Sequence, residues 1–94
     1  MDAPRALTRR YVRVRGRVQG VGYRWFVRTL AEAMGLTGWV RNREDGSVEA
    51  EVEGEPQALD EFVRRLKDGN PAAGVDAIEW SKAAPQGGRG FEIR

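Results

Sequence analysis

Two stretches of the chain alternate apolar and polar residues, as a strand with one buried face does. Residues 9–16 place Val12 and Val14 on one face, between charged or aromatic residues that lie on the other. Residues 48–54 repeat the pattern, with small apolar residues alternating with three glutamates. This period of two predicts two half-buried strands. Shorter apolar runs predict further strands at residues 37–43, 75–80 and 91–94.

Two other stretches carry their apolar residues at the spacing of a helix. Residues 23–34 and residues 56–68 each form one apolar stripe, with polar residues on the remaining sides. This spacing predicts two amphipathic helices. Gly35 is suited to end the first helix, and Pro56 is suited to the first position of the second. The Gly-Asn-Pro sequence of residues 69–71 is expected to end the second helix.

The predicted elements follow one another in the order βαββαβ, with a short strand added at the end. Asp45 and Gly46 predict a hairpin turn between the second and third strands. This order predicts an α+β fold, the ferredoxin-like split βαβ sandwich, in which two helices cover one face of an antiparallel sheet. Its usual strand order, 4-1-3-2, places the first and third strands side by side, so that their outward charges oppose one another. The residues concerned are Arg13 and Arg15 on the first strand and Glu49, Glu51 and Glu53 on the third.

A glycine-rich segment, residues 16–24, joins the first strand to the first helix. Glycines accept positive φ, so the backbone can aim several N–H groups at one point, and the helix start adds its own free N–H groups. Such a segment binds anions, most often phosphate. Arg24 falls in the first helical turn, where a cation is unfavourable by roughly 0.3–1 kcal/mol. Because residues 3–31 contain no acid, Arg24 either binds an anion, points into water or meets a distant carboxylate.

Asn42 lies at the end of the second predicted strand. The first and second strands both run antiparallel to the third, so their carboxyl ends meet at one edge of the sheet. Asn42 is therefore expected on the same edge as Gly16, about two strand spacings (~10 Å) away. This position suits a residue that faces a bound phosphate, and it equally suits an ordinary polar residue before a turn.

Length and composition narrow the possible functions. The 94 residues make one domain, which we divide into an N-terminal tail, residues 1–8, and a folded part, residues 9–94. The lack of cysteine and histidine excludes thiolate nucleophiles, imidazole bases and the metal sites that either would form. The sequence has no apolar run near the roughly 18 residues of a membrane span and no signal-peptide pattern. A cytoplasmic location is expected.

The net charge of +2 is unevenly distributed along the chain. Residues 3–31 carry eight arginines and no acid, whereas residues 32–94 carry thirteen acidic and eight basic residues. A basic first third suits a nucleic acid or a small anionic substrate.

At two places the chain resembles the acylphosphatase family. Residues 16–24, Gly-Arg-Val-Gln-Gly-Val-Gly-Tyr-Arg, match its first signature, and residues 38–49, Gly-Trp-Val-Arg-Asn-Arg-Glu-Asp-Gly-Ser-Val-Glu, match its second. Both matches are free of gaps, and the order of elements agrees along essentially the whole chain. The resemblance implies hydrolysis of the carboxyl–phosphate anhydride of small acyl phosphates, giving a carboxylate and phosphate.

The resemblance also implies roles for single residues. In the family the matching arginine, here Arg24, holds the phosphoryl group together with backbone N–H groups, and the matching asparagine, here Asn42, orients the attacking water. The side chain of Gln19 is expected to tie the loop to the sheet, while Tyr23 and Trp25 either line a pocket or pack against the protein. No cofactor, metal, nucleic acid or membrane is implied, and a monomer is expected. The predicted phosphate-binding residues are Gln19, Gly20, Val21, Gly22, Tyr23 and Arg24.

Two other functions stay open at this stage. The RNA recognition motif shares the βαββαβ order, but the glutamates of the third strand would repel phosphates, and the aromatic RNA-binding sequence of that motif is absent. A domain of the same fold that binds a phosphate-bearing ligand without catalysis is the second alternative.

Overall fold

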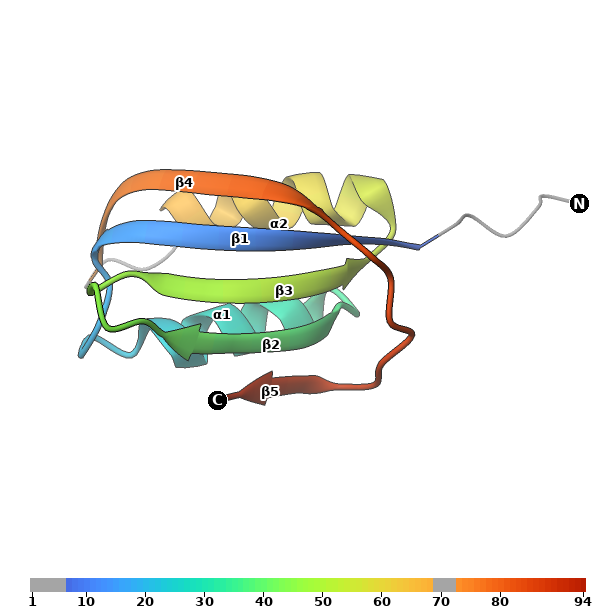
Figure 1. Cartoon of the computed structure of the whole chain (residues 1–94), viewed down its shortest axis with the longest axis horizontal. Helices are drawn as coiled ribbons and strands as arrows, with labels where there is room; N and C mark the ends of the chain where they lie inside the picture. The colour runs from blue at the N-terminus through green and yellow to red at the C-terminus, as the bar shows by residue number, and fades with distance from the viewer. Residues whose placement is uncertain (1–6, 69–72) are drawn as a thin grey trace, which may run out of the picture.

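The computed structural model describes residues 7–68 and 73–94 of the chain. The predicted end of the second helix at residues 69–71 lies outside the described residues, as does most of the predicted tail. Figure 1 shows the elements along the chain. They are β1 (Thr8–Arg17), α1 (Tyr23–Ala33), β2 (Thr37–Asn42), β3 (Val48–Gly54), α2 (Pro56–Asp68), β4 (Gly74–Ala83) and β5 (Phe91–Ile93).

The five strands form one sheet in the order β4-β1-β3-β2-β5. The fold class and the predicted order of the first four strands are confirmed. β5 adds a parallel pair with β2, from Gly38 opposite Phe91 to Val40 opposite Ile93, and this makes the sheet mixed rather than purely antiparallel. The chain leaves β4 at one edge, crosses the end of the sheet and returns beside β2 at the other edge (Figure 1).

Both helices cover the same face of the sheet, and the core lies between the two layers (Figure 1). The apolar stripes predicted from the sequence supply this core. α1 contributes Tyr23, Val27 and Ala31, and α2 contributes Leu59, Phe62 and Leu66. They pack against the inward valines of the strands, such as Val12, Val40 and Val52, which are fully buried. No helix in the described parts of the chain is long and apolar enough to cross a membrane.

β4 is longer than its apolar pattern predicts. The sequence indicates a strand over residues 75–80, whereas the strand extends from Gly74 to Ala83. It pairs with almost the whole of β1, through an irregularity between Arg15 and Gly16. β4 is an edge strand with mostly exposed side chains, so backbone pairing rather than apolar alternation sets its length.

The outer face of the sheet has no helix on it and is covered by charged side chains instead. Arg9 is buried there, and its Nε and Nη1 atoms donate to Glu51 at 2.6 Å and to Glu53 at 3.2 Å. Glu53 also accepts the backbone N–H groups of Gln86 and Gly87, at 2.6 and 2.9 Å. These bonds lower the pKa of Glu53 and attach the segment before β5 to the sheet.

The predicted charge pairing between β1 and β3 is only partly correct. Arg13 does lie opposite Glu49 in the register, as expected. Arg15 instead pairs with Glu79 of β4 at 2.7 Å. The β1–β3 ladder ends at the pair of Val14 and Val48, so Arg15 has no residue of β3 opposite it.

Glu49 is a second buried carboxylate of the outer face, and only 2% of it is exposed. It accepts hydrogen bonds from Tyr11 Oη at 2.5 Å, from Arg43 Nη1 at 2.8 Å and from Arg41 Nε. Burial alone would raise the pKa of Glu49, but these donors outweigh it and lower the pKa to about 2. The charged form therefore stabilises the fold.

This arrangement predicts a specific loss of stability in acid. A carboxyl group whose pKa is lowered on folding stabilises the protein above its unfolded pKa, and that contribution disappears as the pH falls toward the folded pKa. For Glu49 we expect up to about 3 kcal/mol to be lost between pH 5 and pH 2. Urea unfolding of Glu49→Gln should show a shallower pH dependence over this range. Glu92→Gln, which removes an exposed carboxylate of β5, is the control and should keep the wild-type slope; equal slopes in all three proteins would contradict the assignment.

Candidate active site

The glycine-rich segment forms an exposed turn between β1 and α1. Gly20 and Gly22 have φ values of 74° and 76°, in the left-handed region that side chains disfavour. Gly22 is also the N-cap of α1, and no side chain bonds to the N–H groups there. The first turn of an α-helix leaves its backbone N–H groups without intrahelical partners. The segment therefore presents backbone donors and the positive end of the helix dipole at one place.

Two predicted phosphate-binding residues, Val21 and Tyr23, direct their side chains elsewhere. Val21 packs against the core. Tyr23 is buried, and its hydroxyl donates to the backbone oxygen of Leu66 at 2.9 Å. Burial also raises the pKa of Tyr23, so the phenol stays neutral. At these two positions only the backbone N–H group remains available to a ligand.

Gln19 connects the loop to the β2–β3 hairpin. Its side-chain nitrogen donates to the backbone oxygens of Arg43 and Ser47, at 2.7 and 2.9 Å. The hairpin has its own internal bonds, since Asp45 Oδ1 accepts both the N–H and the hydroxyl of Ser47. These contacts give the Gln19 side chain the structural role expected from the sequence. They also fix the distance between the loop and the end of β2.

Arg24 is half-buried in the first turn of α1 and has no aspartate or glutamate partner among residues 7–68 and 73–94. Its Nη1 atom instead donates to the backbone oxygen of Arg94, a long contact of 3.4 Å. Sequence reasoning missed Arg94, because nothing in its local pattern shows that β5 lies beside β2. The guanidinium thus keeps most of its hydrogen-bonding capacity for another group.

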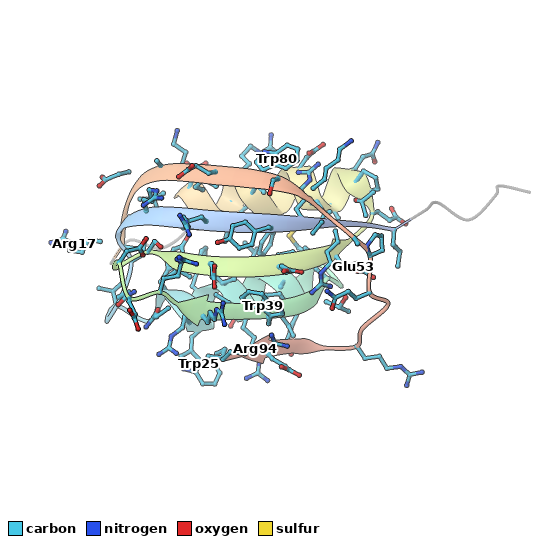
Figure 2. The ribbon with its side chains drawn as sticks, viewed as in Figure 1. Arg17, Trp25, Trp39, Glu53, Trp80 and Arg94 are labelled. Atoms are coloured by element: carbon cyan, nitrogen blue, oxygen red, sulfur yellow. The ribbon has the colours of Figure 1, made fainter. Side chains whose placement is uncertain are left out.

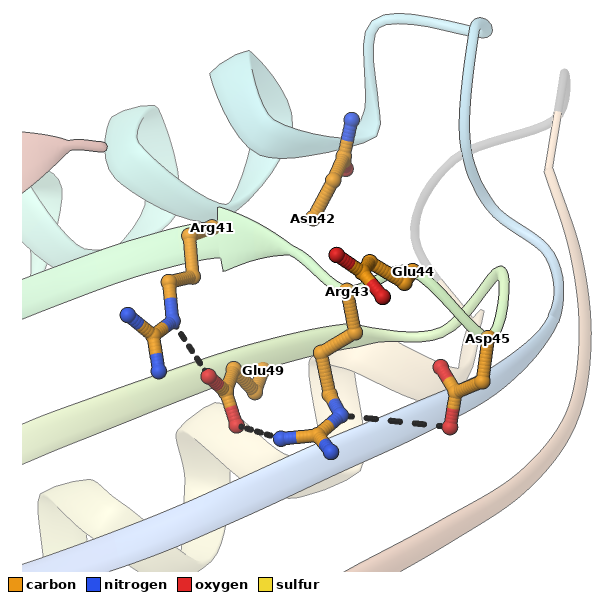
Figure 3. A pocket seen from close by; sticks show the side chains of 6 residues that line it. All are labelled: Arg41, Asn42, Arg43, Glu44, Asp45 and Glu49. Atoms are coloured by element: carbon orange, nitrogen blue, oxygen red, sulfur yellow. Dashed lines mark hydrogen bonds and ion pairs between the residues drawn. The ribbon is translucent and has the colours of Figure 1, made fainter.

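Asn42 is exposed and ends β2, where it pairs with Val48. β1 and β2 both run antiparallel to β3, so their carboxyl ends share one edge, as predicted. In Figure 3 the Asn42 side chain projects to the opposite side of β2 from Arg41 and Arg43, toward the beginning of α1. The structure thus brings Asn42 to the end of the sheet that also carries the glycine-rich loop.

A shallow hollow of about 530 Å³ lies beside Asn42, but its lining does not suit phosphate. Its acidic side chains outnumber its basic ones, and Arg43 is already engaged by Glu49 at 2.8 Å and by Asp45 at 3.8 Å (Figure 3). A phosphate would therefore meet repulsion there. The residues that line the hollow are Arg41, Asn42, Arg43, Glu44, Asp45 and Glu49.

The described residues contain no group of three or more histidine, cysteine, aspartate or glutamate side chains placed to hold a metal ion. The groups that the sequence predicts to act at this end of the sheet are the guanidinium of Arg24, the amide of Asn42 and the backbone N–H groups of the loop. All three bind oxygen atoms of anions or of water.

Comparison with known proteins identifies the family of this chain. The acylphosphatase family model matches residues 10–93. An acylphosphatase from Azoarcus sp. (strain BH72) is 50% identical over 97% of this chain and 93% of its own length. The solved acylphosphatase of Coxiella burnetii superimposes with a TM-score of 0.89 at 36% identity, covering 94% of this chain and 93% of that one. The acylphosphatase of Bacillus subtilis gives 0.87 at 42% identity, covering 95% and 99%.

The family match spans nearly the whole chain, and the relatives are similar over most of their own length. The glycine-rich loop, Arg24 and Asn42 all fall within the matched residues. This chain belongs to the acylphosphatase family of enzymes.

Proposed function

We propose that this enzyme hydrolyses small acyl phosphates by direct attack of water on a phosphoryl group held in the glycine-rich loop. Arg24 and the backbone N–H groups of residues 19–23 bind the phosphoryl oxygens, and Asn42 holds the water. The observation that carries the proposal is a half-buried arginine, with no acidic partner in the described chain, beside a helix start that presents free N–H groups.

The binding step follows from the geometry of the guanidinium. Arg24 offers several N–H donors in one plane, and a phosphoryl group presents pairs of oxygens at a matching spacing. The contact of 3.4 Å to the Arg94 oxygen is long for a hydrogen bond, so it leaves the guanidinium donors of Arg24 available to a phosphoryl group. The backbone donors of the loop stabilise the remaining negative charge without rearrangement.

The chemical step needs positioning more than acid–base strength. The oxygen of water forms a bond to phosphorus while the bond between phosphorus and the carboxyl oxygen breaks, and the leaving group departs as a carboxylate. One proton of the water stays on the oxygen that joins phosphorus, and the other passes to a phosphoryl oxygen. The amide of Asn42 takes up no proton at neutral pH, but it can hold the water in line with the breaking bond.

The outer face of the sheet argues against RNA binding. An RNA recognition motif stacks bases on free aromatic rings of its central strands. Here Trp39 is half-buried, with the guanidinium groups of Arg41 and Arg94 at 5.1 and 5.0 Å from its ring centre. Glu49 lies on the same face at the centre of the sheet. Hydrolysis is thus the better-supported function, while the monomeric state and the cytoplasmic location stay predictions.

We expect Arg24→Ala to lower kcat/KM for benzoyl phosphate by about 10²–10³-fold, because it removes a charged donor from both the bound substrate and the transition state. Inhibition by inorganic phosphate should weaken in parallel. Rates measured with EDTA present exclude a contaminating metal-dependent phosphatase. Arg64→Ala, which removes an exposed arginine of α2, is the matched control and should behave as wild type. An Arg24→Ala variant with wild-type turnover would refute the binding role.

Asn42→Ala tests the water-positioning role separately. We expect kcat to fall by about 10²-fold or more, because the nucleophile loses its orientation. The inhibition constant of inorganic phosphate should stay within about twofold of wild type, because Asn42 contacts the water and not the phosphoryl group. If phosphate affinity falls as far as kcat, Asn42 binds the phosphoryl group instead. If kcat is unchanged, the role is wrong.

Gln19→Leu tests whether the bond between loop and hairpin sets the active geometry. The substitution removes two hydrogen bonds and should lower the free energy of unfolding by about 1–2 kcal/mol. Because it also frees the loop relative to Asn42, we expect kcat to fall more than phosphate affinity. Gln86→Leu is the control, since Gln86 donates to Glu53 through its backbone N–H, which the substitution keeps. A loss of stability with unchanged kcat would limit Gln19 to a structural role.

A further inference from the structure

Trp25 exposes a large apolar ring next to the proposed phosphate site. It directly follows Arg24 in α1, and 64% of the residue is exposed to solvent. Tyr23, two positions earlier, is almost completely buried. Successive helical residues are rotated by about 100°, so Trp25 projects roughly 200° away from Tyr23, on the side of α1 that faces away from the sheet.

The direction of the helix places the indole near the loop. Side chains in an α-helix lean toward its amino end, so the third residue of α1 covers the turn that precedes it. Trp25 lies only about 4.5 Å along the helix axis from the N-cap Gly22. Figure 2 shows Trp25 beyond the β5 edge of the sheet, in the half of the molecule whose end carries Arg17.

A second residue of α1 holds this ring. The guanidinium of Arg28, one turn further on, lies 5.3 Å from the centre of the Trp25 ring. Arg28 is itself paired with Glu32 at 3.4 Å. A cation over one side of an indole restricts its orientation, and the large exposed fraction shows that much of the ring stays open to a ligand.

The proposed reaction directs the acyl group toward this ring. In an in-line displacement the leaving oxygen departs on the side opposite to the attacking water. The water is held by Asn42, at the end of a strand of the sheet, so the carboxyl oxygen leaves on the side away from the sheet. Trp25 projects on that side of Arg24. The carboxyl carbon is separated from phosphorus by a single oxygen. A group attached to that carbon thus lies at the rim of the loop, beside the indole.

We propose that Trp25, held by Arg28, forms the acyl subsite of this enzyme and favours acyl phosphates with a flat aromatic acyl group. The inference rests on the proposed function, and it adds a substrate class to it. An aromatic acyl group stacks on the open part of the indole and buries apolar surface, whereas an acetyl group is too small to cover the ring.

Benzoyl phosphate and acetyl phosphate test this subsite, because they share the reacting anhydride and differ in the acyl group. The measured quantity is the ratio of their kcat/KM values. Trp25→Ala should lower this ratio by about tenfold. Trp25→Phe keeps an aromatic surface and should retain most of the preference. Because Trp25 is exposed, neither substitution disturbs the core.

Trp80→Ala is the matched control. Trp80 is also exposed, at 46%, and also carries a guanidinium, that of Arg10 at 4.1 Å from its ring centre. Trp80 belongs to β4, where it lies opposite Val12 of β1 and away from the glycine-rich loop. We expect the wild-type ratio in this variant.

The outcomes separate the two proposals. A ratio that falls in Trp25→Ala and not in Trp80→Ala supports the acyl subsite. An unchanged ratio in Trp25→Ala, or an equal loss on both substrates, overturns the subsite and leaves the proposed hydrolysis intact. If the wild type hydrolyses neither substrate, the proposed function fails and the subsite fails with it.

Discussion

The site depends on one constraint of the sheet, which is that β1 and β2 both pair antiparallel with β3. This pairing forces β1 and β2 to run parallel to each other, so that the loop after β1 and the residue that ends β2 come out at the same edge. The strand between them sets their separation across the sheet. Gln19 then fixes their relative position, because it bonds the loop to the hairpin that follows Asn42.

The outer face shows how a two-layer protein covers a sheet without a third layer. Long arginine side chains lie across the strands and bury the carboxylates beneath them, as Arg9 does at one end and Arg43 does near the other. The aliphatic part of arginine excludes water while its guanidinium satisfies two acceptors in one plane, which lysine cannot do. This cover requires arginine to stay charged and glutamate to stay ionised. It therefore links the stability of the fold to pH, independently of the apolar core.

Much of this fold follows from the sequence, because the strong patterns come from buried faces. The valines of β1 and the apolar stripes of both helices have to face the core, and they identify their elements with almost correct bounds. The two signature segments place Arg24 and Asn42 in the chain. Hydrolysis by these two residues stays a prediction, since the geometry alone tests neither role.

The features that the sequence did not predict involve edges and long side chains. The partner of Arg15 depends on where the β1–β3 ladder ends, and no local pattern encodes that end. The same holds for β5, whose three residues carry too little periodicity to specify a neighbouring strand. The contact between Arg24 and Arg94 follows from the position of β5 and was missed with it.

That contact has a consequence for the order in which the molecule assembles. It joins two residues that are 70 positions apart in the chain, and it forms only after the last strand has docked beside β2. Chain entropy is lost when the loop between two distant residues closes, and this loss precedes the gain from their contact, whereas local contacts carry little of it. The helix start and its glycines can form early from local interactions. Arg24 gains its contact with Arg94 only when β5 pairs with β2. A growing chain on the ribosome thus carries both signature segments before the strand that completes the surroundings of Arg24.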